Sequence, residues 1–450
     1  AACELALQVY TRETYSQNWA STQTKIGSAY LKRPRGKRSE NIEKSIIAYE
    51  LALQVYTRES FPRDWGMTHG NLGRAYNSRI LGEHAENLEK AIFSYEQASQ
   101  VLTREAFPQD WAGIQINLAN VYSSRLRGER SENIEKAIAI HKLALQVYTR
   151  ESSPADWAAV QSNLGNVYGA RIIGSRTENL EKSISAHKLA LQVYTRESFP
   201  DLWAAAKINL ANTYCNQVGA DQLARIEQAL VLYQQASEVF TRHSFPERWV
   251  EHHSRVAKAL MKRSSLTNNY KDLDNAVELL LQTTELETPN SPTFIDAQYQ
   301  LGNALCHRYE NSQNPQDLEQ ALQAYKIALD AISPEHYDRR QIWQALPTTQ
   351  SILGSRLIRD GEWQEGLQLL LNSVSQLSAG DDAPAHANAL FETGRAHDTL
   401  SDWDNARLYF RDALRLYEYL KDPVGVAKSG AELGNVLVSL GYTQKGLTEL

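Results

Sequence analysis

Apolar residues recur through most of this chain at spacings of three and four positions. The segments "DWAAVQSNLGNVYGARI" at 156–172 and "ENLEKSISAHKLALQVYTRE" at 178–197 both place apolar side chains at i, i+3, i+4 and i+7. Such spacing is typical of an amphipathic α-helix that packs through one face. No strand-like alternation of apolar and polar residues persists anywhere. The pattern therefore predicts an all-α chain.

The two helical segments return at a fixed interval. Six tryptophans mark it, each 46 residues after the last: Trp19, Trp65, Trp111, Trp157, Trp203 and Trp249. A period between 20 and 50 residues is typical of solenoids, in which each unit buries its apolar face against its neighbours. Two helices in each interval make the predicted unit a helical hairpin.

Proline, aspartate and glycine suggest where the helices begin and end. A proline stands three residues before each tryptophan from the second onward: Pro62, Pro108, Pro154, Pro200 and Pro246. Proline suits the first turn of a helix, and the nearby aspartates Asp64, Asp110 and Asp156 favour the positive end of its dipole. The glycines at Gly82, Gly128 and Gly174 are expected to end the first helix of each hairpin.

The unit resembles a tetratricopeptide repeat (TPR). The family favours Leu-Gly at positions seven and eight, which here are Leu72 and Gly73, and an aromatic residue at position twenty-four, here Tyr95. The family period is 34 residues, so the longer period here is a departure. Long repeats of this kind are similar to kinesin-light-chain and LGN-type arrays, and to arrays of large cyanobacterial proteins that carry a CHAT protease domain or a signalling ATPase.

The period drifts after Trp249, although Leu-Gly pairs continue at Leu301, Leu353 and Leu433. We expect a regular array over 1–263, an irregular junction over 264–292 and a diverged array with shorter repeats over 293–450. The resemblance implies a right-handed α-solenoid of about nine hairpins. Both chain ends align inside second helices, and the last one includes Gly446 and Leu450. We therefore expect a segment of a longer protein, whose cut ends expose apolar surface suited to self-association.

The first helix of each hairpin has two faces. Positions four, seven, eight and eleven form the packing face, so Leu164 and Tyr168 are expected to be buried. Positions two, six, nine and thirteen point the other way, and the resemblance implies that they face a concave groove. Position six reads Lys25, Asn71, Asn117, Asn163, Asn209 and Arg255. Position nine reads Ser28, Arg74, Asn120, Asn166, Asn212 and Lys258.

The asparagines on this face have two interpretations. Asparagine is a poor helix former, and its amide both donates and accepts hydrogen bonds. A row of amides could therefore hold the backbone of an extended peptide, with lysine and arginine at both ends. Alternatively, the amides bond to one another, to water or to a neighbouring repeat, and were copied with the unit. The sequence leaves both open.

Other recurring residues favour structural roles. One arginine recurs near the end of each second helix: Arg12, Arg58, Arg104, Arg150, Arg196 and Arg242. Another recurs near the end of most first helices: Arg33, Arg79, Arg125, Arg171 and Arg263. Cations at these places would balance exposed helix carbonyls. The tryptophans should pack between repeats, and His141 and His187, at position twenty-four, should pack between helices.

Composition narrows the functional classes. The net charge of −6 gives no sign of nucleic-acid binding, and no apolar run approaches the ~20 residues that span a bilayer. Three scattered cysteines fit a reducing, cytoplasmic setting and no metal spacing. No catalytic motif, metal site or cofactor site is found, so we expect no enzyme.

The leading hypothesis is a protein- or peptide-binding scaffold within a larger bacterial protein. Two alternatives are a regulatory sensor arm of a CHAT-type protease or signalling ATPase, and a self-associating architectural rod.

Overall fold

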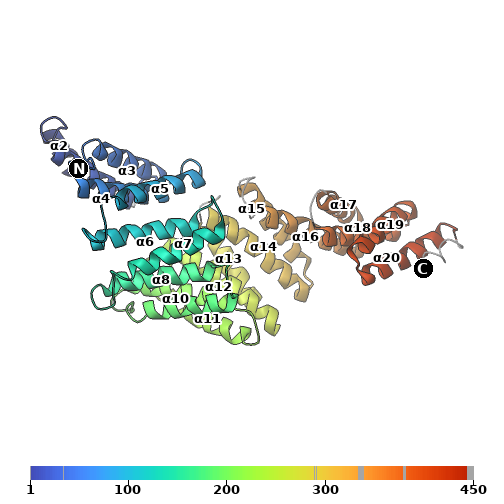
Figure 1. The fold of residues 1–450 in the computed structure, drawn as a ribbon. Helices are drawn as coiled ribbons and strands as arrows, with labels where there is room; N and C mark the ends of the chain where they lie inside the picture. Colours follow the sequence, from blue (N-terminus) through green and yellow to red (C-terminus); the bar gives the residue numbers. More distant parts are fainter. Residues whose placement is uncertain are drawn as a thin grey trace. The chain divides into compact units, whose positions relative to one another are not determined.

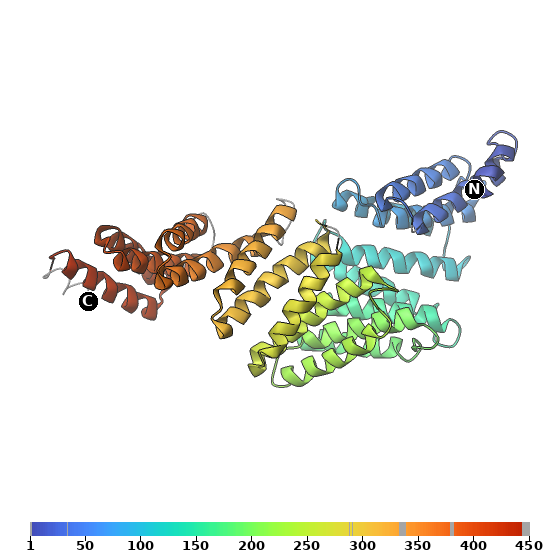
Figure 2. The same cartoon turned by 180° about the vertical axis from the view of Figure 1, so that it is seen from behind.

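The computed structural model describes residues 2–33, 35–287, 289, 291–332, 339–378 and 382–442. Every regular element in these ranges is an α-helix (Figure 1). The chain divides into two compact units, Ala1–Val239 and Phe240–Leu450. Consecutive hairpins within each unit stack side by side, as both views show (Figure 2). The predicted all-α fold of stacked hairpins is confirmed.

The first unit begins with a single helix and continues with five hairpins. Its helices are α1 Ala2–Val9, α2 Ser16–Lys32, α3 Arg38–Leu53, α4 Pro62–Asn77, α5 His84–Ser99, α6 Pro108–Ser124, α7 Arg130–Ala144, α8 Pro154–Ala170, α9 Arg176–Ala190, α10 Pro200–Cys215 and α11 Gln222–Ser237. From α2 onward, each even-numbered helix pairs with the helix that follows it.

The second unit adds four hairpins and a last helix. Its helices are α12 Pro246–Thr267, α13 Lys271–Leu286, α14 Pro292–Ser312, α15 Pro315–Ala331, α16 Arg339–Asp360, α17 Trp363–Ser378, α18 Ala383–Thr399, α19 Trp403–Leu420 and α20 Pro423–Ser439. The described residues thus hold nine hairpins, as expected. Helix α13 occupies most of the segment 264–292. The second helix expected around Gly446 and Leu450 lies outside the described residues.

Helix starts follow the sequence signals. Five first helices begin at the predicted prolines, and Asp64, Asp110 and Asp156 stand in first turns. The helix ends were placed less well. Helix α9 stops at Ala190, not near 197, because the amide of Val193 bonds to the Ala190 carbonyl and tightens the last turn. Tyr194 then points inward and is buried. Its position continues the apolar spacing of α9 although the helix has already ended, so the sequence predicted a longer helix.

The recurring glycines do not end the first helices. Gly82, Gly128 and Gly174 lie in the connection just before the second helix, with φ between 75° and 83°. An L side chain is strained in that region, which explains glycine there. A buried asparagine of the second helix holds each connection: the Asn133 amide, for example, donates to the Arg127 carbonyl at 2.9 Å. This asparagine row, which also includes Asn41, Asn87 and Asn179, is structural.

The core of several hairpins is an aromatic ring packed on a small residue. The Tyr95 ring lies directly over Gly73, where an added Cβ would come within 2.8 Å of it. His187 lies over Gly165 in the same way. Leu164 is buried as predicted, but Tyr168 is only half-buried. The prediction for this position was wrong because its tyrosine reaches the hairpin edge, where the equivalent Tyr76 hydroxyl donates to Glu50 at 2.9 Å.

Histidine replaces the core tyrosine in two consecutive hairpins. His141 and His187 are fully buried, so their predicted packing between helices is confirmed. Neither nitrogen of either ring has a hydrogen-bond partner among the described residues. Burial alone lowers the pKa of each imidazole to about 4.

The tryptophans pack between repeats, as expected. Trp157 contacts both the cluster around Tyr148 and the cluster around Tyr194. The arginine row near the second helices has a different role from the predicted one, because it lies beyond the helix ends. Arg104 stacks over Trp111 and donates to Gln146 of the next hairpin at 2.7 Å. Arg12 and Arg196 make equivalent contacts to Gln54 and Glu238, so these three arginines join repeats.

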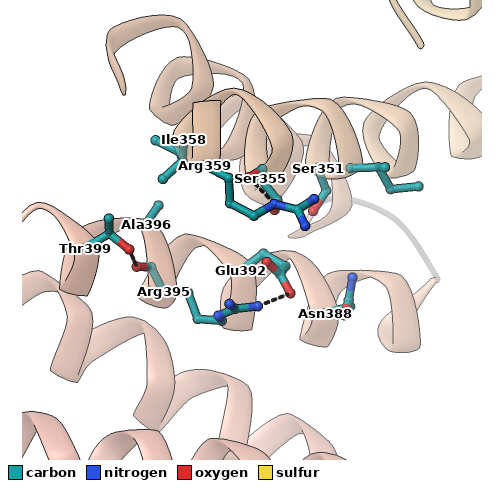
Figure 3. Close-up of a pocket in the computed structure, with 10 residues that line it drawn as sticks. Ser351, Ser355, Ile358, Arg359, Asn388, Glu392, Arg395, Ala396 and Thr399 are labelled. Carbon is teal, nitrogen blue, oxygen red and sulfur yellow. Dashed lines mark hydrogen bonds and ion pairs between the residues drawn. The ribbon is translucent and has the colours of Figure 1, made fainter. Parts of the chain in front are cut away.

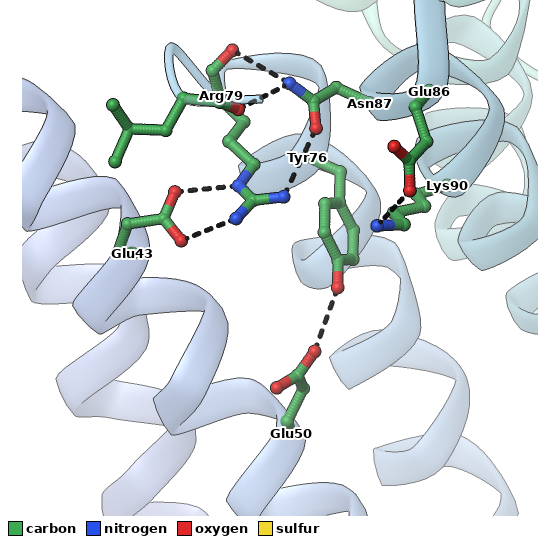
Figure 4. A network of polar contacts seen from close by, with 8 residues as sticks. Glu43, Glu50, Tyr76, Arg79, Glu86, Asn87 and Lys90 are labelled. Atoms are coloured by element: carbon green, nitrogen blue, oxygen red, sulfur yellow. Dashed lines mark hydrogen bonds and ion pairs between the residues drawn. The ribbon is translucent and has the colours of Figure 1, made fainter. Parts of the chain in front are cut away.

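Three arginines of the row at the end of the first helices also join neighbouring hairpins, whereas Arg263 pairs with Asp272 of its own hairpin. Arg125 donates two hydrogen bonds to Glu89 of the preceding hairpin, from Nε to Oε1 and from Nη2 to Oε2, both of 2.8 Å. The same two-point pair joins Arg79 to Glu43 (Figure 4) and Arg171 to Glu135. A planar guanidinium that bonds a carboxylate at two points fixes the orientation of the two side chains as well as the distance between them. We call these three pairs the inter-hairpin forks.

The forks should contribute measurably to stability. A double-mutant cycle of Arg125→Ala and Glu89→Ala should give a coupling energy of about 1 kcal/mol, since both side chains are only 24% exposed and the geometry is bidentate. Chemical denaturation of the four proteins measures it. The same cycle on the exposed pair Lys90 and Glu86 is the control and should give less. Equal coupling energies in the two cycles would contradict this role.

Candidate functional site

Packing shows which helices line the inner side of the array. In the first unit, each first helix contacts the first helix of the next hairpin, from α2 through α10. Among the described residues, no second helix makes a comparable contact with the next second helix. The elements of a curved stack approach most closely on its concave side. Within this unit, the first helices therefore line the concave side.

The predicted groove residues of the first unit lie on these helices with partly accessible side chains. The asparagines at position six are all half-buried: Asn71, Asn117, Asn163 and Asn209. At position nine, Asn120 and Asn212 are half-buried and Asn166 is exposed, as are Lys25 and Arg74. Within the described part of the chain, none of the position-six amides has a side-chain hydrogen bond.

Position nine differs from position six. The Tyr233 hydroxyl donates to Asn212 Oδ1 at 2.5 Å, and the Tyr325 hydroxyl donates to Asn303 Oδ1 at 2.8 Å. Ser28 and Tyr49 make the same contact at 3.0 Å. Position nine therefore partners the core tyrosine, which gives it a structural role in those hairpins. The position-six amides remain the stronger candidates for ligand contact.

The basic residues predicted for the groove also differ from one another, in whether they form an ion pair. Arg255 pairs with Glu251 at 2.5 Å, and Lys258 pairs with Asp296 at 2.8 Å, all within the second unit. Lys25 and Arg74 have no ion pair among the described residues. The predicted cations of the second unit are thus engaged, whereas those of the first unit are accessible.

The second unit has a cavity of about 260 Å³ between α16 and α18. Counting from Gly394 as position eight, its α18 lining includes positions two, six, nine and thirteen, which are Asn388, Glu392, Arg395 and Thr399, together with Ala396 at position ten. On α16 the cavity is lined by Ser351, Ile352, Ser355, Ile358 and Arg359. Sequence reasoning identified this face but did not name these residues. The Leu-Gly register at 353–354 and Gly394 could have located them.

This cavity is rich in hydrogen-bond donors (Figure 3). Arg359 Nε donates to the Ser355 carbonyl at 3.3 Å, which leaves its two terminal nitrogens free of any described partner. The Oγ atoms of Ser351 and Ser355 are buried and have no partner among the described residues. Arg395 Nη1 lies 3.5 Å from Glu392 Oε1, so this pair is loose. We call this cavity the donor pocket.

A second cavity, of about 590 Å³, adjoins the donor pocket and shares Asn388, Glu392 and Arg395 with it. It lies between α18 and α20, and its other charged lining residues are Asp422, Lys428 and Glu432. Burial, followed by the negative charge of Glu432, raises the pKa of the nearby Asp398 carboxyl. The Glu432 carboxylate is thus close enough to disfavour the charged form of Asp398. We call this cavity the acidic pocket.

No group of three histidine, cysteine or acidic side chains in the described ranges is arranged to hold a metal ion. Among the helices described, none combines the length and apolar character needed to cross a bilayer.

Comparisons with known proteins concern the fold of this chain. A tetratricopeptide-repeat family model matches residues 345–418, which include the donor pocket. A comparison with curated protein sequences gave no match. A signal transduction ATPase with a tetratricopeptide-repeat sensor, from Pyrococcus horikoshii, is similar in structure with a TM-score of 0.50 and 12% identity. The alignment covers 99% of this chain and 63% of that one.

Two further solved structures are similar at 12% identity. Apo RapI gives a TM-score of 0.49 over 90% of this chain and 99% of its own. The apo quorum sensor NprR from B. thuringiensis gives 0.46 over 88% of this chain and 96% of its own. The family match over residues 345–418 and the hairpin architecture of the described residues together support a tetratricopeptide-repeat array.

Proposed function

We propose that this array recognises extended protein segments along the face formed by positions two, six, nine and thirteen of its first helices. One observation carries the proposal. The two pockets of the second unit lie on this face, which the residue pattern singles out independently of any cavity. An extended segment suits such a face because its backbone groups recur along the chain as the helices recur along the array.

The position-six asparagines support the proposal in the first unit. Their amides are half-buried on the concave side and have no side-chain partner among the described residues. An amide of this kind can both donate to and accept from a peptide backbone. Four such amides on successive first helices would hold a backbone without selecting its side chains.

The test replaces Asn117, Asn163 and Asn209 together with alanine. Each lost amide should remove about 0.5–1.5 kcal/mol of binding free energy, so the triple variant should bind about 1.5–4.5 kcal/mol more weakly if the sites are independent. The measurement is the affinity of the purified chain for peptides selected from an extended-peptide library. Folding should survive, because alanine is the better helix former.

Asn133→Ala is the matched control, since Asn133 holds a connection away from this face. It should lower stability and leave peptide affinity unchanged. If the folded triple variant keeps its affinity, the ligand binds elsewhere. If the triple variant loses helicity instead, the amides have the structural role that the sequence left open.

A further inference from the structure

We infer that the segment bound along α16, α18 and α20 carries an acidic and a basic side chain three residues apart in a polyproline-II conformation. The acidic side chain would occupy the donor pocket and the basic one the acidic pocket. This inference rests on the proposed function, and it adds a charge pattern and a spacing that the position-six amides do not impose.

The donor pocket requires a group rich in acceptors. Ser351 is 3% exposed, and its hydroxyl, like that of Ser355, reaches no acceptor among the described residues. Arg359 leaves its two terminal nitrogens free of described partners. An unpaired buried hydroxyl costs free energy, so a ligand that satisfies it is favoured. A carboxylate accepts several such bonds at once and neutralises the guanidinium.

The acidic pocket has the opposite preference. Asp422 caps α20 and carries its negative charge into the lining. Among the residues that the structure describes, Glu432 accepts a hydrogen bond only from the Asn435 amide, at 3.4 Å, and it lies near Asp398. Lys428 is the cation that faces these carboxylates in the lining, apart from Arg395, which pairs with Glu392. A ligand cation would be attracted to this lining, in which the carboxylates outnumber the cations by one.

The spacing follows from the helices. The two pockets share three residues and lie on either side of α18, so they are about one helix spacing apart, ~8–10 Å. A polyproline-II chain rises about 3.1 Å per residue with three residues per turn, so positions i and i+3 face the same way about 9 Å apart. In a β-strand, positions i and i+2 face the same way but only ~7 Å apart. The polyproline-II spacing is closer to the helix spacing than the strand spacing is.

The test uses four nine-residue, proline-rich fluorescent peptides. One carries glutamate and lysine three positions apart, one carries them two positions apart, and two carry a pair of glutamates or a pair of lysines three positions apart. At 0.1 M salt the first peptide should bind the full chain about tenfold more tightly than each of the others, by fluorescence anisotropy. The preference should weaken as salt rises.

Charge reversal of the protein makes the test independent of losses caused by misfolding. Glu432→Lys should switch the preference to the glutamate pair, and Arg359→Glu should switch it to the lysine pair. Arg415→Glu, the same change on the second helix α19 outside both pockets, is the control and should keep the original preference.

The outcomes separate the two proposals. Binding of all four peptides with equal affinity would overturn the charge pattern and leave the proposed function standing. Tight binding of the peptide with a two-residue spacing would overturn the polyproline-II spacing. Absence of binding by every peptide, to the wild type and to both reversal variants, would count against the proposed function in the second unit and against the inference with it.

Discussion

Between pH 6.5 and pH 4 the first unit should lose about 3 kcal/mol of stability for each of His141 and His187. The unfolded imidazole has a pKa near 6.5, whereas burial lowers the folded pKa of each to about 4. The unfolded chain therefore binds protons that the folded chain excludes as the pH falls. The stabilisation is complete above pH 6.5 and is lost progressively toward pH 4.

The sequence supplies its own control for this prediction. Other hairpins carry tyrosine at the same position, over glycine as in Tyr95 and Gly73 or over alanine as in Tyr233 and Ala211. The double variant His141→Tyr and His187→Tyr should fold and should lose less stability on acidification. Carboxylates titrate equally in both proteins, so they cancel in the difference. Urea denaturation at several pH values measures it. If the free energy of unfolding depends on pH identically in the two proteins, protonation of the histidines does not destabilise the folded state.

Replacing Tyr95 with alanine should cost about 3–5 kcal/mol. Tyr95 is 1% exposed, and its cluster joins α4 and α5 to the next hairpin through Leu118 and Val121. Removing a buried aromatic ring leaves a cavity that the packed helices cannot fill. Gly73 contributes to the loss, because it has no side chain to move into the space.

The damage should be local, because repeats in an array contact only their neighbours. Amide hydrogen exchange should show lost protection in α4–α7 and little change in α10 and α11. Tyr168→Ala is the matched control: its half-buried side chain should cost clearly less in chemical denaturation. A uniform loss of protection across the first unit would argue against nearest-neighbour coupling.

Sequence periodicity predicted the helices well because each hairpin repeats the same local signals. Prolines and apolar spacing located the starts of the first helices at Pro108 and Pro154. Helix ends were harder, since Tyr194 continues the apolar spacing while its backbone has left the helix. The glycine at Gly174 was assigned to the wrong end of its connection because sequence alone does not show which residue adopts positive φ.

The candidate site was only partly predictable. The helical periodicity of the first helices predicted which face carries the site. The asparagine row on that face indicated a site in the first unit. Ser351 and Arg359 of α16 line the donor pocket, and Glu432 of α20 lines the acidic pocket. These residues do not recur at a fixed interval, so no repeat marks them. The recurring asparagines also belong to two sets with different surroundings. The Asn133 side chain holds a connection, whereas the Asn117 side chain has no hydrogen-bond partner among the described residues.

The inter-hairpin forks have a consequence for how this protein can change its length in evolution. Glu89 and Arg125 belong to consecutive copies of one unit. Each copy carries one half of two pairs, as Arg125 pairs with Glu89 of the preceding copy and Glu135 pairs with Arg171 of the following copy. Duplication or loss of one whole 46-residue unit therefore leaves each fork with a partner. A gain or loss of any other length would separate them. Within the fork-bearing region, the array can grow or shrink by whole units without a new interface having to evolve.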